Sequence, residues 1–205
     1  MAKERWKPGN MLYPLPVVMV SLADREGKTN IITLAWVGTV NTNPPMVSVS
    51  IRPERYSHRI IKETGEFVIN LTTKELAYCT DYCGVKSGRD VDKFKELRLT
   101  PEPAELVKAP MIAESPVNLE CKVTQVQSLG SHDLFLAEVV AVHADDKYMD
   151  EAHRFHLEWA QPLVYSHGSY FVCGEQVGTF GYSVRKKKTS KGVQKRKNDK
   201  GCQGR

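Results

Sequence analysis

Two arginines and a serine stand close together in the chain: Arg52, Arg55 and Ser57. Guanidinium and hydroxyl groups are good phosphate donors, and the first backbone N–H groups of a helix point outward toward an anion. A helix is predicted over residues 56–64, and Ser57 is expected to cap it. The segment is therefore a candidate phosphate cradle. The alternative is a surface turn whose arginines are merely solvated.

The residues before these arginines predict the strand that positions them. Over residues 46–51, valine and isoleucine alternate with methionine and serine, which is the period of a strand with one buried face. Pro53 cannot donate to a strand ladder and disfavours helix at Arg52, so the chain must turn there. The arginines are thus expected at the end of a strand.

Composition indicates an ordinary globular protein. The chain has 205 residues, of which 41% are hydrophobic and 26% charged, enough for one domain with a full core or at most two small ones. No apolar run approaches the roughly 20 residues that span a bilayer. The first ten residues lack the apolar core of a signal peptide, so a cytoplasmic location is expected, with no membrane partner.

The positive charge belongs to the C-terminal end. Residues 185–205 carry ten Lys or Arg and one acid, whereas residues 1–184 carry nineteen bases and twenty-three acids. We expect a folded domain over 1–184 and a disordered basic tail over 185–205. Such a tail attracts nucleic acid or an anionic surface non-specifically. It lacks the interleaved aromatics of a single-strand binder, so a solvated tail is favoured and nucleic acid is an unlikely partner.

Five cysteines are present, an odd number in no disulfide or zinc spacing, which fits a reducing compartment: Cys79, Cys83, Cys121, Cys173 and Cys202. Cys79 and Cys83 share one face of a predicted helix and in principle suit a metal or cluster. No second pair follows, so thiols in or beside the core are favoured and no metal site is expected.

The remaining segments predict many short strands with helices between them. Strands are expected at 17–22, 31–37, 46–51, 66–71, 117–124, 134–143, 163–166 and 169–173, helices at 56–64 and from Thr72 or Thr73 to Cys83, and loops at 23–30, 38–45, 85–94 and 128–133. Residues 6–16 are expected to be an extended lead-in packed on the body. In strand 117–124, Leu119 and Cys121 should share one face and Asn118 and Glu120 the other.

This pattern indicates a mainly β fold, an antiparallel barrel decorated by inserted helices. No repeated βαβ rhythm and no G-x-G-x-x-G motif is visible, which argues against a Rossmann nucleotide fold.

Three segments carry a family resemblance: TNIITLAWVGTVNTNPPMVSVSI (29–51), RYSHRIIKETGEFVINL (55–71) and SGRDVDKF (87–94). In this order and spacing they resemble the flavin reductase-like family with an FMN-binding split barrel, and within it the flavoredoxins. The resemblance covers about residues 10–175. It implies an antiparallel Greek-key split β-barrel of the FMN-binding type, a homodimer with one FMN per subunit, and a partner chain near the flavin.

Nine residues are expected to bind the cofactor: Asn30, Trp36, Ser50, Arg55, Ser57, Ser87, Lys93, His132 and Tyr165. By resemblance, Asn30 and Trp36 flank the flavin, Ser57 and Lys93 hold its phosphate, and His132 approaches it. Tyr165 stands where the family places an aromatic residue.

The chemistry of the side chains agrees with the roles that the resemblance implies. Arg55 and Ser87 add charge and a hydroxyl for a phosphate monoester. Trp36 offers a flat apolar platform for the ring, and the backbone of residues 48–51, which includes Ser50, offers hydrogen-bond donors.

Each expectation has a simpler alternative. Trp36 suits a hydrophobic core equally well. Lys93 can form an exposed ion pair with Asp90 or Asp92. A hairpin histidine such as His132 is often only solvent-exposed. Ser57 can serve as a helix cap alone.

The predicted function is electron transfer by an FMN flavoprotein, an oxidoreductase whose electron donor is NADH, NADPH or a redox protein and whose acceptor is free flavin, a ferric complex or a protein. The alternative from another class is a non-enzymatic barrel that holds nucleic acid through its basic tail. A hydrolase that uses His132 ranks last, since no nucleophile motif is visible.

Overall fold

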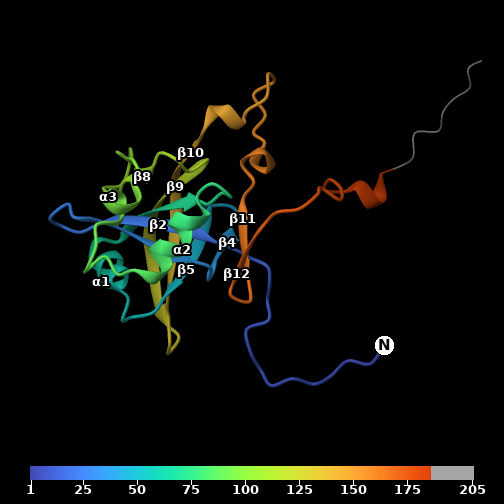
Figure 1. Cartoon of the computed structure of the whole chain (residues 1–205), viewed down its shortest axis with the longest axis horizontal. Coiled ribbons are helices and arrows are strands. Elements are labelled where there is room, and N and C mark those ends of the chain that lie inside the picture. Colours follow the sequence, from blue (N-terminus) through green and yellow to red (C-terminus); the bar gives the residue numbers. More distant parts are fainter. Residues whose placement is uncertain (186–205) are drawn as a thin grey trace, which may run out of the picture. The chain divides into compact units, whose positions relative to one another are not determined.

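The computed structural model describes residues 1–185 (Figure 1). The chain divides into two units, Met1–Cys173 and Gly174–Arg205. The first unit holds every element described below except a short 3-10 helix, η3 (Tyr182–Val184). Of the predicted basic tail only Arg185 is described, so the expected disorder of residues 186–205 lies outside the described residues, and the expected boundary after residue 184 stays a prediction.

A seven-stranded sheet forms the centre of the first unit. In spatial order its strands are β3 (Thr29–Leu34), β2 (Val18–Ala23), β6 (Glu66–Leu71), β9 (Val117–Ser128), β10 (Asp133–Ala144), β5 (Met46–Ile51) and β4 (Val37–Asn41). A three-stranded sheet contains β1 (Leu15–Pro16), β11 (Leu163–Ser166) and β12 (Ser169–Val172), and a two-stranded sheet contains β7 (Pro101–Glu102) and β8 (Met111–Ile112). All pairings among these strands are antiparallel, which confirms the predicted mainly β, antiparallel fold.

Helices occupy the connections, as expected. They are α1 (Tyr56–Thr64), α2 (Ala77–Val85), α3 (Lys93–Leu97) and the 3-10 helices η1 (Asp146–Tyr148) and η2 (Leu157–Ala160). Among residues 1–185, no helix combines the length and the apolar composition that crossing a membrane requires.

Strand β2 is buried on both faces, because α2 and α3 cover one side of it. On the inner side, Val20 packs in one cluster with Phe67 and Phe135, all fully buried. On the other side, Met19 packs in a second cluster that includes Phe94 of α3. Burial of a large apolar side chain contributes roughly 1.5–3 kcal/mol, so β2 and its neighbour β3 are firmly held. These strands form the floor on which the site is built.

Helix α1 ends at the residue that was predicted, but it begins with a different cap. Its C-cap is Gly65 in the left-handed conformation (φ 71°), as predicted. Its N-cap is Arg55, which makes no side-chain capping bond, so the prediction that Ser57 caps the helix is wrong. The turn at Pro53 places the first helical residue at Tyr56, and Ser57 already lies inside the first turn.

The start of α2 was predicted too early. The helix begins at Ala77, after a turn in which the Thr73 hydroxyl oxygen accepts from the Leu76 N–H at 3.3 Å. The Thr72 hydroxyl donates instead to the Val17 carbonyl at 2.6 Å. Thr72 therefore ties the turn to the core and does not start the helix.

Two further predictions need correction. Part of the predicted loop 38–45 is strand β4, an edge strand paired with β5 as far as Asn41. The lead-in packs on the body only in its later part. Trp6 is 71% exposed, whereas the Met11 sulfur lies 3.5 Å from His167 Nε2 and β1 pairs with β11.

Glu120 lies on the face of β9 that was predicted to be polar, yet it is fully buried. Its carboxylate accepts from the N–H groups of Glu105 (2.8 Å), Leu106 (2.6 Å) and Val107 (3.0 Å), and lies 2.7 Å from the ring of His143. Burial raises the pKa of the Glu120 carboxyl, but these hydrogen bonds outweigh it and leave the pKa below its usual value. The carboxylate thus fixes the connection that covers this face.

Candidate functional site

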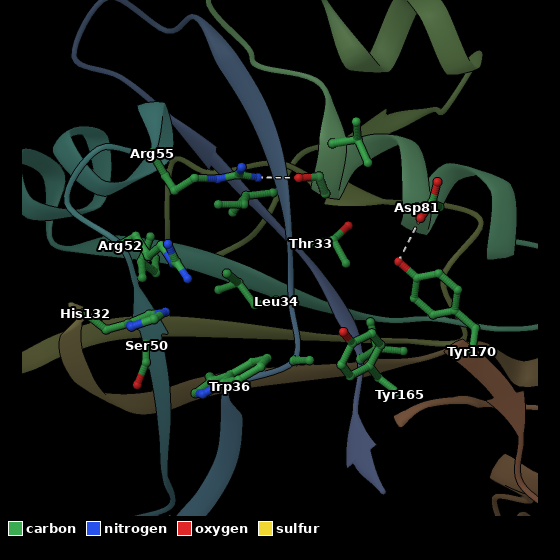
Figure 2. Close-up of a pocket in the computed structure, with 16 residues that line it drawn as sticks. Thr33, Leu34, Trp36, Ser50, Arg52, Arg55, Asp81, His132, Tyr165 and Tyr170 are labelled. Carbon is green, nitrogen blue, oxygen red and sulfur yellow. Dashed lines mark hydrogen bonds between the residues drawn. The ribbon is translucent and has the colours of Figure 1, made fainter. Parts of the chain in front are cut away.

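A cavity of about 320 Å³ opens between β3, the end of β5, the end of α2, the loop before β10, and strands β11 and β12. Figure 2 shows two chemically different sides. Arg52, Arg55 and His132 lie on one side, and Asp81 and Tyr170 lie opposite them. We call this the ring cavity, because aromatic side chains form much of its wall.

Trp36 and Tyr165 provide the aromatic wall of the ring cavity. The indole of Trp36 is 40% exposed, so the alternative that it is a core residue is wrong. Its ring lies 6.3 Å from that of His132, with only 9° between the planes, and 6.5 Å from that of Tyr165. A flat apolar surface held open in this way suits a planar ligand.

His132 is half-buried beside Trp36, which distinguishes it from a freely exposed hairpin residue. Its Nδ1 lies 2.9 Å from the Ser131 hydroxyl. The adjacent Asp133 is tied to α1 by a buried contact of 2.8 Å with the ring of His58. That bond to His58 holds the pKa of the Asp133 carboxyl below its usual value. The hairpin that carries His132 is therefore anchored to α1.

Ser50 also lines the ring cavity, but its backbone is not a free donor. Its N–H donates to the Trp36 carbonyl at 2.9 Å, because β5 lies between two paired strands. The expectation that the Ser50 N–H would donate to a ring is therefore wrong, and its side-chain hydroxyl is the donor that lines the cavity.

Asp81 and Tyr170 form the opposite side of the ring cavity, and neither was predicted. The Tyr170 hydroxyl donates to Asp81 Oδ1 at 3.1 Å. Burial and the neighbouring carboxylate raise the pKa of Tyr170 to about 12, so the phenol keeps its proton at neutral pH. The pair joins α2 to β12 across the cavity.

A second cavity of about 260 Å³ adjoins the first, and Ile32, Arg55 and Val85 line both. We call it the anion cavity. Its lining includes the first residues of α1, whose N–H groups have no partner within the helix, together with Lys86 and Arg89. Positive side chains, hydroxyls and a helix N-terminus are the donor set that binds phosphate.

Asn30 and Ser57 meet at the buried base of the anion cavity. The Asn30 Nδ2 donates to Ser57 Oγ at 2.9 Å, whereas its Oδ1 has no partner among residues 1–185 although Asn30 is only 3% exposed. A Cβ on Gly88 would lie 2.1 Å from that oxygen, so only glycine permits the approach. An unpaired buried oxygen costs about 1–3 kcal/mol, which a ligand hydroxyl or N–H would relieve.

Lys93 lines the anion cavity, but two backbone carbonyls bind its ammonium. Nζ donates to Cys83 O at 2.9 Å and also to Ile31 O. The alternative of an exposed pair with Asp90 or Asp92 is wrong, because Lys93 is only 3% exposed. Burial lowers the pKa of Lys93 to about 8, and Arg55 contributes to the lowering. Lys93 therefore supplies mainly fixed positive charge.

Arg89 lines the anion cavity and Lys28 contacts Tyr56, which also lines it; neither basic residue was predicted from the sequence. The Ser87 hydroxyl, which was predicted, accepts from the Arg89 N–H at 3.2 Å. The guanidinium of Arg89 lies 5.8 Å from the ring centre of Tyr56, and Lys28 Nζ lies 5.7 Å from it. The sequence offers one weak signal for these two residues: each follows a glycine in a predicted loop.

The nine predicted site residues thus all line one of the two joined cavities. The ring cavity receives Trp36, Ser50, Arg55, His132 and Tyr165, and the anion cavity receives Asn30, Arg55, Ser57, Ser87 and Lys93.

The cysteines are placed apart from this chemistry. Burial raises the pKa of Cys83 to about 12 and that of Cys121 to about 12, so both are neutral thiols. Within the described part of the chain, no three His, Cys, Asp or Glu side chains are arranged to hold a metal ion. Cys202 lies outside the described residues.

Comparison with known proteins identifies similar chains. The family model "Flavin reductase like domain" matches residues 10–174. Flavoredoxin of Desulfovibrio vulgaris (Miyazaki F) is 29% identical, with a TM-score of 0.84 over 90% of this chain and 100% of that one. Flavoredoxin from Methanosarcina acetivorans is 31% identical, with a TM-score of 0.78 over 89% and 100% of the two chains.

A more distant protein shares the fold. A putative flavin reductase with a split barrel domain from Shewanella frigidimarina is 24% identical, with a TM-score of 0.74 over 82% of this chain and 86% of that one. The expected split barrel is thereby confirmed.

Proposed function

The chain belongs to the flavin reductase like family, and from this premise we propose that it binds FMN and transfers electrons between a reduced donor and an acceptor. The proposed donor is NADH, NADPH or a redox protein, and the proposed acceptor is free flavin, a ferric complex or a protein. The ring of FMN would occupy the ring cavity and its phosphate the anion cavity.

The observation that carries this proposal is the joining of two chemically distinct cavities through shared residues. Ile32, Arg55 and Val85 line both, so one ligand with an aromatic end and an anionic end fits the pair. FMN has these two ends with a polyhydroxyl chain between them. The unpaired Asn30 Oδ1 requires a hydrogen-bond donor, which is the chemistry of a hydroxyl on that chain.

The residues of the anion cavity have separable roles in this proposal. Ser57, Ser87 and the first N–H groups of α1 donate to the phosphate oxygens, and Arg89 and Lys93 supply positive charge. Gly88 leaves space for the Asn30 amide. Together these groups replace the water that a dianionic phosphate loses on binding.

The residues of the ring cavity position a planar group and set the charge around it. Trp36 and Tyr165 provide apolar contact. Arg52 and Arg55 place positive charge along one side, which stabilises a ligand that gains negative charge there. FMN, when bound, supplies reversible two-electron chemistry, and the protein supplies orientation and electrostatics.

The wider setting of the protein is part of the proposal. The family resemblance supports a homodimer whose partner chain lies near the flavin. The described cysteines are free thiols, which supports a reducing compartment such as the cytoplasm. A nucleic-acid-binding barrel is not favoured, because its case depends on tail residues outside the described part of the chain.

The experiment is to purify the protein, record its visible absorbance, release any chromophore with heat and identify it by mass spectrometry. We expect a flavin spectrum, release of FMN and rebinding of added FMN by the stripped protein. Oxidation of NADH or NADPH in the presence of free flavin or a ferric complex then tests the donor. A colourless protein that binds neither FMN nor FAD would overturn the proposal.

A further inference from the structure

A third cavity of about 490 Å³ lies between the N-terminal segment and strands β4 and β5. Its walls are formed by residues 9–13 and Leu15 on one side and by Trp36, Val37, Ser48 and Ser50 on the other. Trp36 and Ser50 also line the ring cavity. We call this the outer cavity. Its volume lies in the range of ligand sites, about 300–1,000 Å³.

The outer cavity differs from the other two in charge. None of the described residues that line it is acidic or basic, whereas Arg52, Arg55, Asp81 and His132 line the ring cavity. An uncharged lining cannot compensate the loss of water around a charged ligand. The lining of the outer cavity therefore suits an uncharged ligand better than a charged one.

The N-terminal wall of the outer cavity is held in place by aromatic contacts. The ring of Tyr13 lies 4.2 Å from that of His167 and 6.2 Å from that of Tyr165. The sulfur of Met11 lies 3.5 Å from His167 Nε2, and the Tyr13 N–H donates to the Met11 carbonyl at 3.1 Å. Leu15 then enters β1, which pairs with β11. The wall is thus fixed to the three-stranded sheet.

Two groups in the outer cavity suit a flat molecule with one polar substituent. The indole of Trp36 is 40% exposed and offers a stacking surface. The Ser48 hydroxyl makes only a long contact, 3.5 Å, with the Gly38 carbonyl, so it remains able to bond a ligand. A ring compound that stacks on Trp36 and bonds Ser48 would satisfy both.

We propose that the outer cavity binds a small, uncharged ring compound that bears a hydroxyl or carbonyl group. The proposal goes beyond FMN binding. The outer cavity shares Trp36 and Ser50 with the ring cavity, whereas the N-terminal segment, Val37 and Ser48 line the outer cavity and not the ring cavity.

The test is calorimetric titration of the full-length protein, in excess FMN, with 2-naphthol and with 2-naphthalenesulfonate. These probes share two fused rings and differ in charge. We expect one 2-naphthol per chain and at least tenfold weaker binding of the sulfonate. Absence of 2-naphthol binding, or equal binding of the two probes, would overturn the proposal.

A cavity-filling variant locates the binding. Ser48→Leu should weaken 2-naphthol binding at least tenfold, because the added side chain enters the outer cavity, while FMN affinity stays within twofold. Thr39→Leu is the matched control, since Thr39 is exposed on the neighbouring strand β4 and does not line the cavity. Ser48→Ala keeps the space and removes the hydroxyl, so a smaller loss, about threefold, is expected.

The outcomes separate this inference from the proposed function. Binding of 2-naphthol that Ser48→Leu leaves unchanged would place the probe elsewhere, for example in the ring cavity, and would overturn the inference. Dissociation of an oligomer by Ser48→Leu, seen by light scattering, would also overturn it, because the cavity would then be a contact between copies. Ser48-dependent binding in a protein that fails to bind FMN would support the inference and overturn only the proposed function.

Discussion

Gly88→Ala adds a single methyl group at the base of the anion cavity. The backbone of Gly88 does not have the left-handed φ that favours glycine, so the substitution introduces no backbone strain of that kind. The new Cβ would lie 2.1 Å from Asn30 Oδ1 and 2.4 Å from its Cγ, far inside van der Waals contact. Asn30 is 3% exposed and cannot move into solvent without leaving Ser57. The variant therefore tests the Asn30 arrangement directly.

The magnitude follows from two contributions. Overpacking of a buried site costs about 1–3 kcal/mol, and loss of the Asn30–Ser57 hydrogen bond costs about 0.5–1.5 kcal/mol. We expect the free energy of unfolding to fall by about 2 kcal/mol. The added methyl group also displaces the Asn30 amide from the ligand. If the ligand loses about 1.4 kcal/mol of interaction, FMN affinity should fall about tenfold.

Urea unfolding followed by circular dichroism measures the first quantity, and quenching of flavin fluorescence measures the second. Gly38→Ala is the matched control, because a Cβ at Gly38 meets no atom within 4 Å. In an Asn30→Ala background the crowded atoms are absent, so Gly88→Ala should cost less than about 0.5 kcal/mol there. An equal cost in both backgrounds would refute the reasoning.

Three other substitutions probe separate parts of the site and fold. Arg89→Ala should weaken FMN binding by about 1.5–3 kcal/mol and leave riboflavin binding nearly unchanged in parallel titrations, because only FMN carries the phosphate; equal losses would show that Arg89 does not act on that group. Trp36→Ala should weaken both ligands by a similar factor, about tenfold, since both present the same ring to the indole; a loss confined to one ligand would contradict this placement. Glu120→Gln should lower the free energy of unfolding at pH 7 by about 1–3 kcal/mol. Three backbone N–H groups donate to the two carboxylate oxygens, whereas an amide offers them only one acceptor oxygen. Because the pKa of Glu120 is lowered in the folded protein, the ionised carboxylate stabilises the fold above the unfolded carboxyl pKa, and this stabilisation is lost as the pH falls through the folded pKa. The difference in unfolding free energy between wild type and variant should therefore shrink in acid. A difference that stays constant in urea titrations from pH 7 to 3 would contradict the assignment.

Local pattern was enough to predict most of the fold. Alternation and β-branched residues located β2, β5, β6, β11 and β12, and glycine marked the end of α1. The errors lie where a distant segment decides the outcome. Strand β4 exists because β5 offers it a partner edge, and a glycine near its start read as a loop signal.

Burial of polar residues was also beyond local pattern. Glu120 alternates with apolar residues and reads as solvent-facing, but the connection before β9 folds back over it and supplies its N–H donors. The residues near Glu120 in the sequence do not predict these partners.

The candidate site was predicted unevenly for a similar reason. Its nine expected residues came largely from the family resemblance, and all of them line the two joined cavities. Asp81 and Tyr170 were missed because their hydrogen bond joins segments 89 residues apart. Ser57 was predicted as a helix cap, whereas its partner is the distant amide of Asn30.

In the proposed complex with FMN, the ring cavity and the anion cavity, both lined by Arg55, would hold the two ends of one ligand. Once either end of a two-ended ligand is held, the other end is presented to its own cavity at an effective concentration of order millimolar for a short flexible link. Riboflavin and inorganic phosphate supplied as separate molecules lack that advantage. The selectivity of the site therefore resides in the covalent connection between the two ends as much as in the contacts that each end makes.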